Sequence, residues 1–247
     1  MKILFLDIET FPNVAYVWGK YQQDVIRYRQ QSCIACFVAK WLDGEVIAKS
    51  LLDYPDYVAG SYDDLRLVLE LWKLFNEADG IVAHNGRDFD IKVCNARFIY
   101  HVLTPPSPYK TIDTKDVVKK VARFNSNKLD DLGQLLGIGK KVKTDFDLWE
   151  GCINGDRKSW ARMLRYNTHD VLLLEKLYKR MLPWISNHPN RTLYDERSLC
   201  PKCGSRRTVY RGSSITSTAS YQTFQCKDCG GWGRSIKRDK HSTITNV

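Results

Sequence analysis

Two carboxylates stand at the end of a short apolar run near the start of the chain. The run Ile3–Leu6 is typical of a buried β-strand, and Asp7-Ile8-Glu9-Thr10 follows it directly. Because side chains alternate between the two faces of a strand, Asp7 and Glu9 point to the same side. Two carboxylates that close repel each other unless a positive charge lies between them. The pair therefore indicates a site for divalent cations, completed by carboxylates from elsewhere in the chain.

Two later segments carry candidate partners for this pair. Residues 81–90 run from a short apolar strand through a glycine-containing turn to Asp90 at a helix start, where aspartate is also an ordinary cap. Tyr166 and Asp170 are four residues apart, so they share one face of a helix within an apolar, core-facing pattern. An ionisable pair in such a pattern is costly unless it is satisfied. Taken singly, each segment also fits a purely structural role.

In their order and spacing, the three segments together resemble the DEDD superfamily of 3′–5′ exonucleases, in the subgroup that uses tyrosine. The matching motifs are Asp7-x-Glu9-Thr10, Asn85-x-x-x-Phe89-Asp90 and Tyr166-x-x-x-Asp170. The middle motif and the stretch 128–132 are most similar to the proofreading domains of family B DNA polymerases and their stand-alone relatives. The sister subgroup has histidine where this chain has Arg165, which excludes that form. The resemblance covers about residues 1–185.

The resemblance implies a ribonuclease H-like fold and hydrolysis of terminal phosphodiesters with two Mg²⁺ or Mn²⁺ ions. It implies that Asp7 bridges both ions, that Glu9 and Asp170 complete one site, and that Asp90 holds the second. Tyr166 would orient the attacking water, since its reference pKa of about 10 makes it a poor base at neutral pH. Candidate substrate contacts in these motifs are Thr10, Asn85 and Phe89.

Several neighbouring polar residues are alternatives or receive structural roles. Asp88 is an alternative to Asp90, and His169 is a weaker candidate because it points to a different part of the helix surface from Asp170. We expect turn, cap or surface roles for Asp113, Asp130 and Asp131. His84 is expected to pack or hydrogen-bond near the end of its strand.

The elements that must position these residues are those of an α/β domain. Within residues 1–52 we expect strands over 3–6, 13–18, 34–42 and 46–52, with a hairpin turn at Asp43-Gly44, and a further short strand is predicted at 81–83. Helical spacing predicts helices over 62–78, 91–102, 129–136 and 160–184, and a strand edge and helix over 111–121. Strands followed by helices with an intervening strand favour a mixed sheet flanked by helices. We expect this domain to span 1–185, followed by a linker at 186–198.

Four cysteines near the end of the chain form two Cys-x-x-Cys pairs: Cys200, Cys203, Cys226 and Cys229. This spacing resembles a zinc ribbon, which we place at 199–247. Four thiolates suit one tetrahedral Zn²⁺, and binding would supply folding energy to a segment too short for a large core. Cys33 and Cys36 share the spacing but lie in a predicted strand; with Cys94 and Cys152 we expect them to be buried structural cysteines.

The net charge of +10 is uneven, since residues 186–247 contain 11 Lys and Arg against 4 Asp and Glu. This balance suggests a polyanionic partner such as nucleic acid, although basic surface can also serve solubility. The ribbon interleaves basic and aromatic residues, which suits phosphates and bases of a single strand, or else the aromatics fill its small core. Its candidate contacts are Arg206, Arg207, Arg211, Trp232 and Arg234.

The sequence and the resemblance thus predict a metal-dependent 3′–5′ exonuclease that acts on single-stranded DNA in replication or repair. The ribbon would bind the substrate or a replication or repair protein. Three alternatives stay open: an exoribonuclease or oligonucleotide nuclease, a structure-selective endonuclease, and a non-catalytic nucleic-acid-binding module. No apolar run approaches the roughly 20 residues of a membrane helix. We expect an intracellular, cytoplasmic protein, nucleoid-associated if its source is bacterial or viral.

Overall fold

The computed structural model describes residues 1–21, 23–195, 197 and 199–245. The chain divides into two compact units, the first formed by residues 2–178 and the second by residue 1 with residues from 179 onward. Within the described residues, no helix combines the length and the apolar character needed to cross a membrane.

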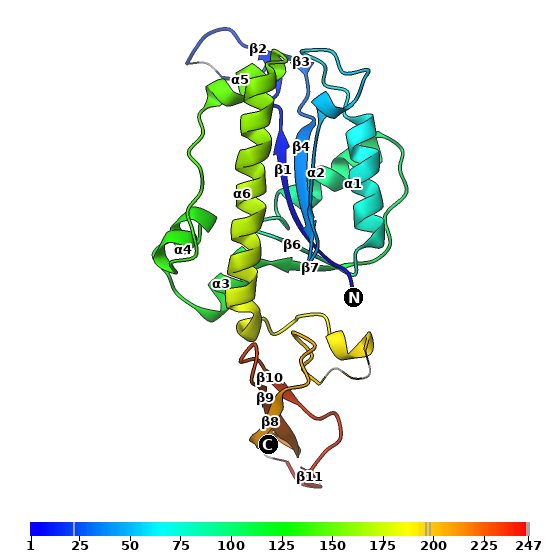
Figure 1. The fold of residues 1–247 in the computed structure, drawn as a ribbon, viewed down its shortest axis with the longest axis vertical. Helices are drawn as coiled ribbons and strands as arrows, with labels where there is room; N and C mark the ends of the chain where they lie inside the picture. The colour runs from blue at the N-terminus through cyan, green and yellow to red at the C-terminus, as the bar shows by residue number, and fades with distance from the viewer. Residues whose placement is uncertain (22, 196, 198, 246–247) are drawn as a thin grey trace. The chain divides into compact units, whose positions relative to one another are not determined.

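The first unit is built on a five-stranded mixed sheet (Figure 1). Its strands are β1 (Ile3–Thr10), β4 (Ile34–Trp41), β5 (Val46–Ser50), β6 (Gly80–Ala83) and β7 (Lys110–Asp113), in the order β5-β4-β1-β6-β7. The β5-β4-β1 half is antiparallel, and β1, β6 and β7 run parallel. The mixed sheet flanked by helices that the sequence predicts is confirmed.

Helices pack on both faces of this sheet. The helices of this unit are α1 (Leu65–Glu77), α2 (Asp90–Tyr100), α3 (Thr114–Val121), α4 (Leu129–Leu135), α5 (Phe146–Ile153) and the long α6 (Arg157–Met181). α1 and α2 contact β4, and α2 also contacts β1. On the opposite face of β1, the ring of Phe5 meets the ring of Tyr178 from α6 edge-on, with centroids 5.2 Å apart. The odd-numbered side chains of β1 therefore face α6.

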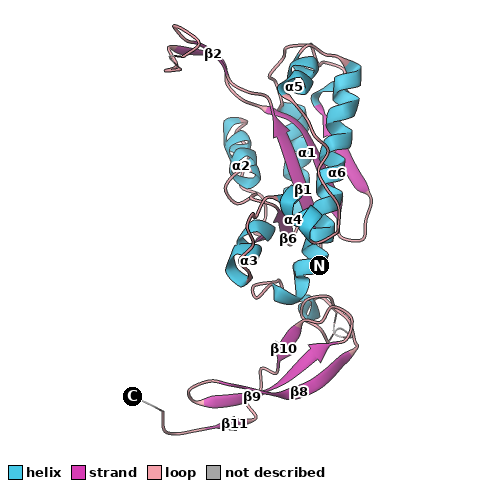
Figure 2. Cartoon of the chain, turned by 90° about the vertical axis from the view of Figure 1, so that its left-hand side faces the viewer, coloured by secondary structure: helices cyan, strands magenta, loops and turns pink. Residues whose placement is uncertain are grey.

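The helices predicted from spacing are present, with ends shifted by a few residues, while two elements were not predicted. One is α5, whose sequence contains Gly151, a residue type that disfavours helices. The other is β3 (Arg27–Gln30), which pairs with β2 (Val14–Tyr16) in a separate two-stranded sheet. Figure 2 shows this hairpin projecting from the end of β1, away from the helices.

The second unit contains a small antiparallel sheet beside the cysteine pairs. Its central strand β9 (Ala219–Cys226) pairs with β8 (Thr208–Ile215) on one edge, and with β10 (Trp232–Arg234) and β11 (Lys240–His241) on the other. Two short 3₁₀ helices, Leu182–Trp184 and Arg191–Leu193, precede the sheet.

A buried carboxylate joins three elements of the first unit. Asp64, just before α1, is fully buried and accepts hydrogen bonds from the backbone N–H of Ile34 at 2.8 Å and from Arg97 of α2 at 2.6 and 2.8 Å. His101 Nε2 lies 2.6 Å from the same carboxylate. Because Asp64 accepts hydrogen bonds from β4 and from α2 and lies at the start of α1, it fixes β4, α1 and α2 relative to one another.

Asp64→Ala is expected to lower the free energy of unfolding by about 3–5 kcal/mol, because Arg97 would keep a nearly buried charge without its partner. Urea denaturation followed by circular dichroism measures this. The matched control is Asp56→Ala, which removes an ion pair to Arg66 whose two side chains are 57% and 55% exposed. Its loss should stay within about 1 kcal/mol. Equal losses in the two variants would contradict a structural role for Asp64.

Candidate active site and metal centre

Strand β1 presents Asp7 and Glu9 on the face that meets α6. In the sheet, Asp7 lies opposite Val38 and Glu9 opposite Cys36 of β4, while the parallel pairing with β6 ends at Phe5. The register of β1 against β4 shifts between Glu9 and Thr10. Such bulges commonly re-aim side chains beside functional sites. The end of β1 is therefore free of a neighbouring strand on one side, where other acidic groups can approach.

Asp90 fills part of that free edge. It opens α2, it is only 4% exposed, and its Oδ1 accepts a hydrogen bond from the backbone N–H of Ile8 at 3.1 Å. A side chain at Gly86 would meet Ala83 Cβ at 2.2 Å, so only glycine allows this turn to lie so close to its strand. Asp88, the alternative, lies at the surface and pairs with Lys92 at 3.4 Å. The turn thus delivers Asp90, and not Asp88, to β1.

Helix α6 brings Asp170 and Tyr166 to the same face of the sheet. Its buried seam passes through Met163, Asn167, Asp170 and Val171, and Asn167 Nδ2 lies 3.8 Å from the Sγ of Cys36, the residue opposite Glu9. Asp170 is 1% exposed, and among the described residues its Oδ1 has no hydrogen-bond partner, while its Oδ2 pairs with Lys141. A buried carboxylate oxygen without a donor is the state expected of a metal ligand.

Lys141 also reaches this site, which sequence reasoning missed. Its Nζ lies 2.7 Å from Asp170 Oδ2 and 5.4 Å from the centre of the Tyr166 ring. Its backbone N–H donates to Asp130 Oδ1 at 2.7 Å, and His169 Nε2 lies 2.6 Å from the carbonyl oxygen of the preceding Lys140. Asp130 and His169 therefore hold the loop that carries Lys141. Because this loop has neither a motif nor a periodic pattern, spacing alone could not have revealed it.

The carboxylates influence one another electrostatically. Burial raises the pKa of Asp7 well above its usual range, and the charges of Asp90, Glu9 and Asp170 raise it further. Burial likewise raises the pKa of Glu9 to about 8 and that of Asp90 to about 6. Lys141 opposes all of these shifts. The four acids thus form one interacting set that carries less than its full negative charge unless cations join it.

The pKa values of Lys141 and Tyr166 are raised as well. Burial works against the charge of Lys141, but the ion pair with Asp170 outweighs it, so the pKa of Lys141 is raised above its ordinary value. Burial, together with the charges of Glu9 and Asp170, raises the pKa of Tyr166. Both groups are therefore protonated at neutral pH, as a cation and as a neutral phenol.

The acidic set fits hard divalent cations in its chemistry, since carboxylate oxygens are the ligands that Mg²⁺ and Mn²⁺ prefer. Its geometry is looser than that of the cysteines. Among the described residues, the group of three or more metal-ligating side chains whose ligand atoms all lie within 4.8 Å of one another is the cysteine quartet. In the acidic set, an ammonium group stands at Asp170 instead.

The remaining residues of the middle motif lie at the ends of β6 and β7. Asn85 adopts a φ of 69°, and its Oδ1 accepts a hydrogen bond from Lys115 Nζ at 2.8 Å, while Phe89 is 43% exposed. Asp113 caps α3 and is buried, in agreement with the cap role predicted for it. His84 hydrogen-bonds Thr114 and Asn127 at 2.9 Å each, also as expected.

The four terminal cysteines lie together in the second unit. Cys200 Sγ is 3.7 Å from Cys229 Sγ, and Cys203 Sγ is 3.6 Å from Cys226 Sγ. Four thiolates about 2.3 Å from a tetrahedral Zn²⁺ would be about 3.8 Å apart, so the observed spacing fits this ion. Gly204 and Gly230, one residue after each pair, adopt φ values of 78° and 74°. The other cysteines, at 33, 36, 94 and 152, are buried in the first unit, as predicted.

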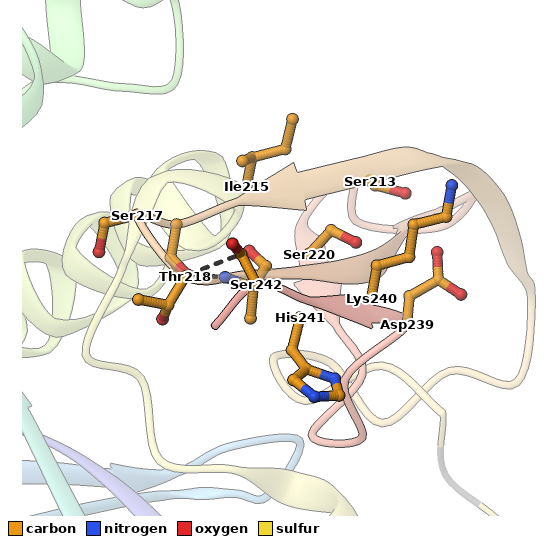
Figure 3. Close-up of a pocket in the computed structure, with 11 residues that line it drawn as sticks. Ser213, Ile215, Ser217, Thr218, Ser220, Asp239, Lys240, His241 and Ser242 are labelled. Carbon is orange, nitrogen blue, oxygen red and sulfur yellow. Dashed lines mark hydrogen bonds between the residues drawn. The ribbon is translucent and has the colours of Figure 1, made fainter. Parts of the chain in front are cut away.

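The ribbon side chains predicted to contact substrate are exposed, and two of them have partners within the unit. Arg207 pairs with Asp228 at 2.7 Å, and the guanidinium of Arg234 lies 4.2 Å from the centre of the Tyr221 ring. Trp232 is 51% exposed. A cavity of about 510 Å³ between β8, β9 and β11 is lined mainly by small hydroxyl side chains (Figure 3). None of the predicted ribbon contacts lines it.

In metal-free protein, stability is expected to fall as the pH rises from about 4.5 to about 8. Over that range the unfolded chain has released protons that folded Glu9 still holds, because its pKa is raised from 4.5 to about 8. Lys141→Met should steepen the fall, because Asp7, Glu9 and Asp90 lose a cation that opposes the rise of their pKa values. The expected extra loss at pH 8 is about 1–3 kcal/mol, measured by urea unfolding in chelator.

Lys140→Met is the control, since Lys140 is exposed and adjacent in sequence. It should leave the pH dependence of the wild type unchanged. A Lys141→Met protein that loses the same stability at pH 5 as at pH 8 would show that Lys141 acts by packing and not by its charge.

Comparison with known proteins places this arrangement in a family. A search of curated proteins finds no match. Among solved structures, the chain is similar to the family B DNA polymerase of the hyperthermophilic archaeon Pyrobaculum calidifontis, with a TM-score of 0.54 and 18% identity. That similarity covers 74% of this chain and 24% of the polymerase, so it concerns part of that enzyme and shows the fold alone. The family model of the RNase_H superfamily matches residues 4–182. Since this match spans most of the chain, the protein belongs to the RNase_H superfamily.

Proposed function

We propose that the first unit is a metal-dependent 3′–5′ exonuclease that hydrolyses the terminal phosphodiester of DNA, with single strands as substrate. The observation that carries the proposal is the convergence of Asp7, Glu9, Asp90 and Asp170 into one electrostatically interacting set, with Tyr166 beside it. These are the residues of the three motifs that resemble the tyrosine subgroup of DEDD exonucleases. The similarity to part of a DNA polymerase supports DNA as the substrate.

The carboxylates would hold two Mg²⁺ or Mn²⁺ ions, which supply an activated water and stabilise the leaving 3′ oxygen. The charges of Asp90, Glu9 and Asp170 all raise the pKa of Asp7, which supports a shared role for the four acids. Asp170 offers Oδ1, which accepts no hydrogen bond from the part of the chain that the structure describes. Asp90 is held at the edge of β1 by the N–H of Ile8. By the resemblance, Asp7 would contribute to both ion sites, Glu9 and Asp170 to one of them and Asp90 to the other.

Tyr166 would position the attacking water as a neutral phenol. Its raised pKa excludes a large phenolate population at neutral pH, so it can donate or accept a hydrogen bond but does not act as a free base. Thr10 ends β1, Asn85 follows β6, and Phe89 caps the start of α2; these three residues are proposed to contact the substrate. The setting we propose is intracellular DNA replication or repair.

Asp7→Asn is expected to reduce cleavage by more than the 10–100-fold typical of residues that only support a metal ligand. The measurement is digestion of 5′-labelled and 3′-labelled DNA and RNA, single- and double-stranded, with Mg²⁺, with Mn²⁺ and with chelator. The expected pattern is stepwise shortening of single-stranded DNA from its 3′ end. Asp88→Asn, an exposed aspartate in the same motif, should retain wild-type activity.

The same assay separates the other functions. Preferential degradation of RNA would replace DNA by RNA as the substrate class. Cleavage of a circular single strand would establish an endonuclease and refute the exonuclease proposal. If wild type and Asp7→Asn are equally inert with either ion, the unit is a binding module.

We further propose that the cysteine quartet binds one structural Zn²⁺ and that the resulting ribbon holds the substrate or a replication or repair protein. The purified chain should contain about one zinc per molecule, and Cys203→Ser should lose it, because three thiolates bind far more weakly than four. Zinc released by thiol modification and detected colorimetrically gives the stoichiometry. Cys94→Ala, at a buried cysteine of the first unit, should keep its zinc. A Cys203→Ser protein with a full complement of zinc would contradict the proposed site.

A further inference from the structure

The hairpin of β2 and β3 exposes an unusual amount of apolar surface. Between residues 14 and 28, eight large apolar side chains are more than a third exposed, with Trp18 at 84% and Tyr21 at 91%. The full set is Val14, Tyr16, Val17, Trp18, Tyr21, Val25, Ile26 and Tyr28. A two-stranded hairpin has no core of its own, and contiguous exposed apolar patches mark interaction sites. The density of these side chains therefore points to a binding surface.

The base of the hairpin is tied firmly to the end of the catalytic strand. The N–H of Phe11 donates to the carbonyl of Cys33 at 3.0 Å, and the N–H of Ser32 donates to Asn13 Oδ1 at 2.7 Å. Tyr62 Oη donates to the carbonyl of Pro12 at 3.1 Å. Val14 follows Glu9 by five residues, which at full extension is about 17 Å. A strand whose end lies at Asp7 and Glu9 would therefore pass within reach of the hairpin.

The charge of the hairpin is positive. It carries Lys20, Arg27 and Arg29 against Asp24, and among the described residues the structure records no ion pair for these three cations. In the register of the two strands, Arg27 lies opposite Tyr16, so a cation and an aromatic ring stand side by side on one face. Tyr28 lies opposite Ala15 on the other face. Aromatic surfaces therefore alternate with cations that are available to a partner.

A cavity of about 300 Å³ continues this surface toward the body of the first unit. Tyr28, Arg29, Tyr62 and Tyr100 line it, together with the glutamines at 30 and 31 and Arg97, whose guanidinium lies 4.3 Å from the centre of the Tyr100 ring. Among the described residues, no carboxylate lines this cavity. Since Arg97 is paired with Asp64, Arg29 is the cation of this lining that has no recorded ion pair. The rings together with Arg29 favour a partner that offers flat apolar faces and negative charge.

We propose that the β2–β3 hairpin is a binding surface for single-stranded nucleic acid. Its bases would stack on Tyr16, Trp18 and Tyr21, and its phosphates would bind Arg27 and Arg29. The inference rests on the proposed function for the nature of the strand that leaves the active site. Stacking tolerates every base because each has an aromatic face, and the cations follow the backbone. Neither contact selects a sequence, which suits an enzyme that shortens strands of any composition.

The test measures binding directly, in the full-length chain made inactive by Asp7→Asn. Fluorescence anisotropy follows a labelled oligothymidylate of about 16 nucleotides, long enough to cover a typical single-strand site. Trp18→Ala and Tyr21→Ala should each weaken binding by about 5- to 150-fold, the loss of one stacked base. Arg27→Ala and Arg29→Ala should each reduce the slope of log affinity against log salt by about 0.7. The matched control is Ile99→Ala, 75% exposed on α2, which should bind as the parent does.

The outcomes separate this inference from the proposed function. If the aromatic variants bind as the parent does, the hairpin inference is wrong, even when the wild type cleaves DNA. If the wild type cleaves nothing, the proposed function fails, while the anisotropy still decides whether the hairpin binds a strand. In an otherwise wild-type chain, Trp18→Ala should cleave a dinucleotide, too short to reach the hairpin, at the normal rate. A wild type that sediments as an oligomer and a Trp18→Ala protein that sediments as a monomer would instead make the hairpin a contact between copies and overturn the inference.

Discussion

The constraint on which the first unit depends is the confinement of four carboxylates to a partly buried volume beside one strand. Burial raises the pKa of each acid. The pKa of Asp7 is raised further by the charges of the other three. Such a set is tolerable only when protons or cations accompany it, since isolated charges in a low-dielectric environment are strongly disfavoured. The protein supplies one cation itself, through Lys141. Its single charge pairs with Asp170 and leaves the acids near β1 in need of further positive charge.

The architecture of the sheet follows from the same constraint. β6 pairs with β1 only as far as Phe5, so Asp7 and Glu9 lie beyond the parallel ladder, where a third neighbour can enter. Asp90 enters there, and in accepting the N–H of Ile8 it replaces the hydrogen bond that a longer β6 would have made. The shortened strand thus serves two purposes, opening the site and leaving a backbone donor that orients one of its acids.

Residue spacing was sufficient to predict which residues of the site share a face of one strand or one helix. Strand alternation predicted that Asp7 and Glu9 share a face, and their registers opposite Val38 and Cys36 agree. Helical spacing placed Asp170 beside Tyr166. The choice between Asp90 and Asp88, by contrast, depends on a turn with Asn85 at positive φ, which spacing does not encode.

Lys141 and β3 could not be predicted for a related reason. Lys141 reaches Asp170 from a loop whose course is set by Asp130 and His169, residues distant from each other in sequence. Both looked like surface or alternative catalytic residues, because a hydrogen bond to a remote backbone leaves no local pattern. β3 contains two arginines, a tyrosine and a glutamine, all exposed, so it lacks the apolar alternation that identifies a half-buried strand. β3 forms because β2 lies opposite it, and its polar composition reflects the exposure of all four side chains.

The two candidate metal sites differ in how completely the fold prepares them. The thiols of the cysteine quartet already stand at the separations of a tetrahedral Zn²⁺ complex, and two glycines shape the turns around them. In the acidic set, an ammonium group occupies part of the space, so ion binding there must rearrange Lys141 or accommodate it. The difference follows from chemistry: neutral thiols can gather without a metal, whereas ionised carboxylates repel one another until protons or cations join them. A site that must bind and release substrate and ions can remain incomplete, whereas a site that holds a small unit together must be close to its final geometry before the ion arrives.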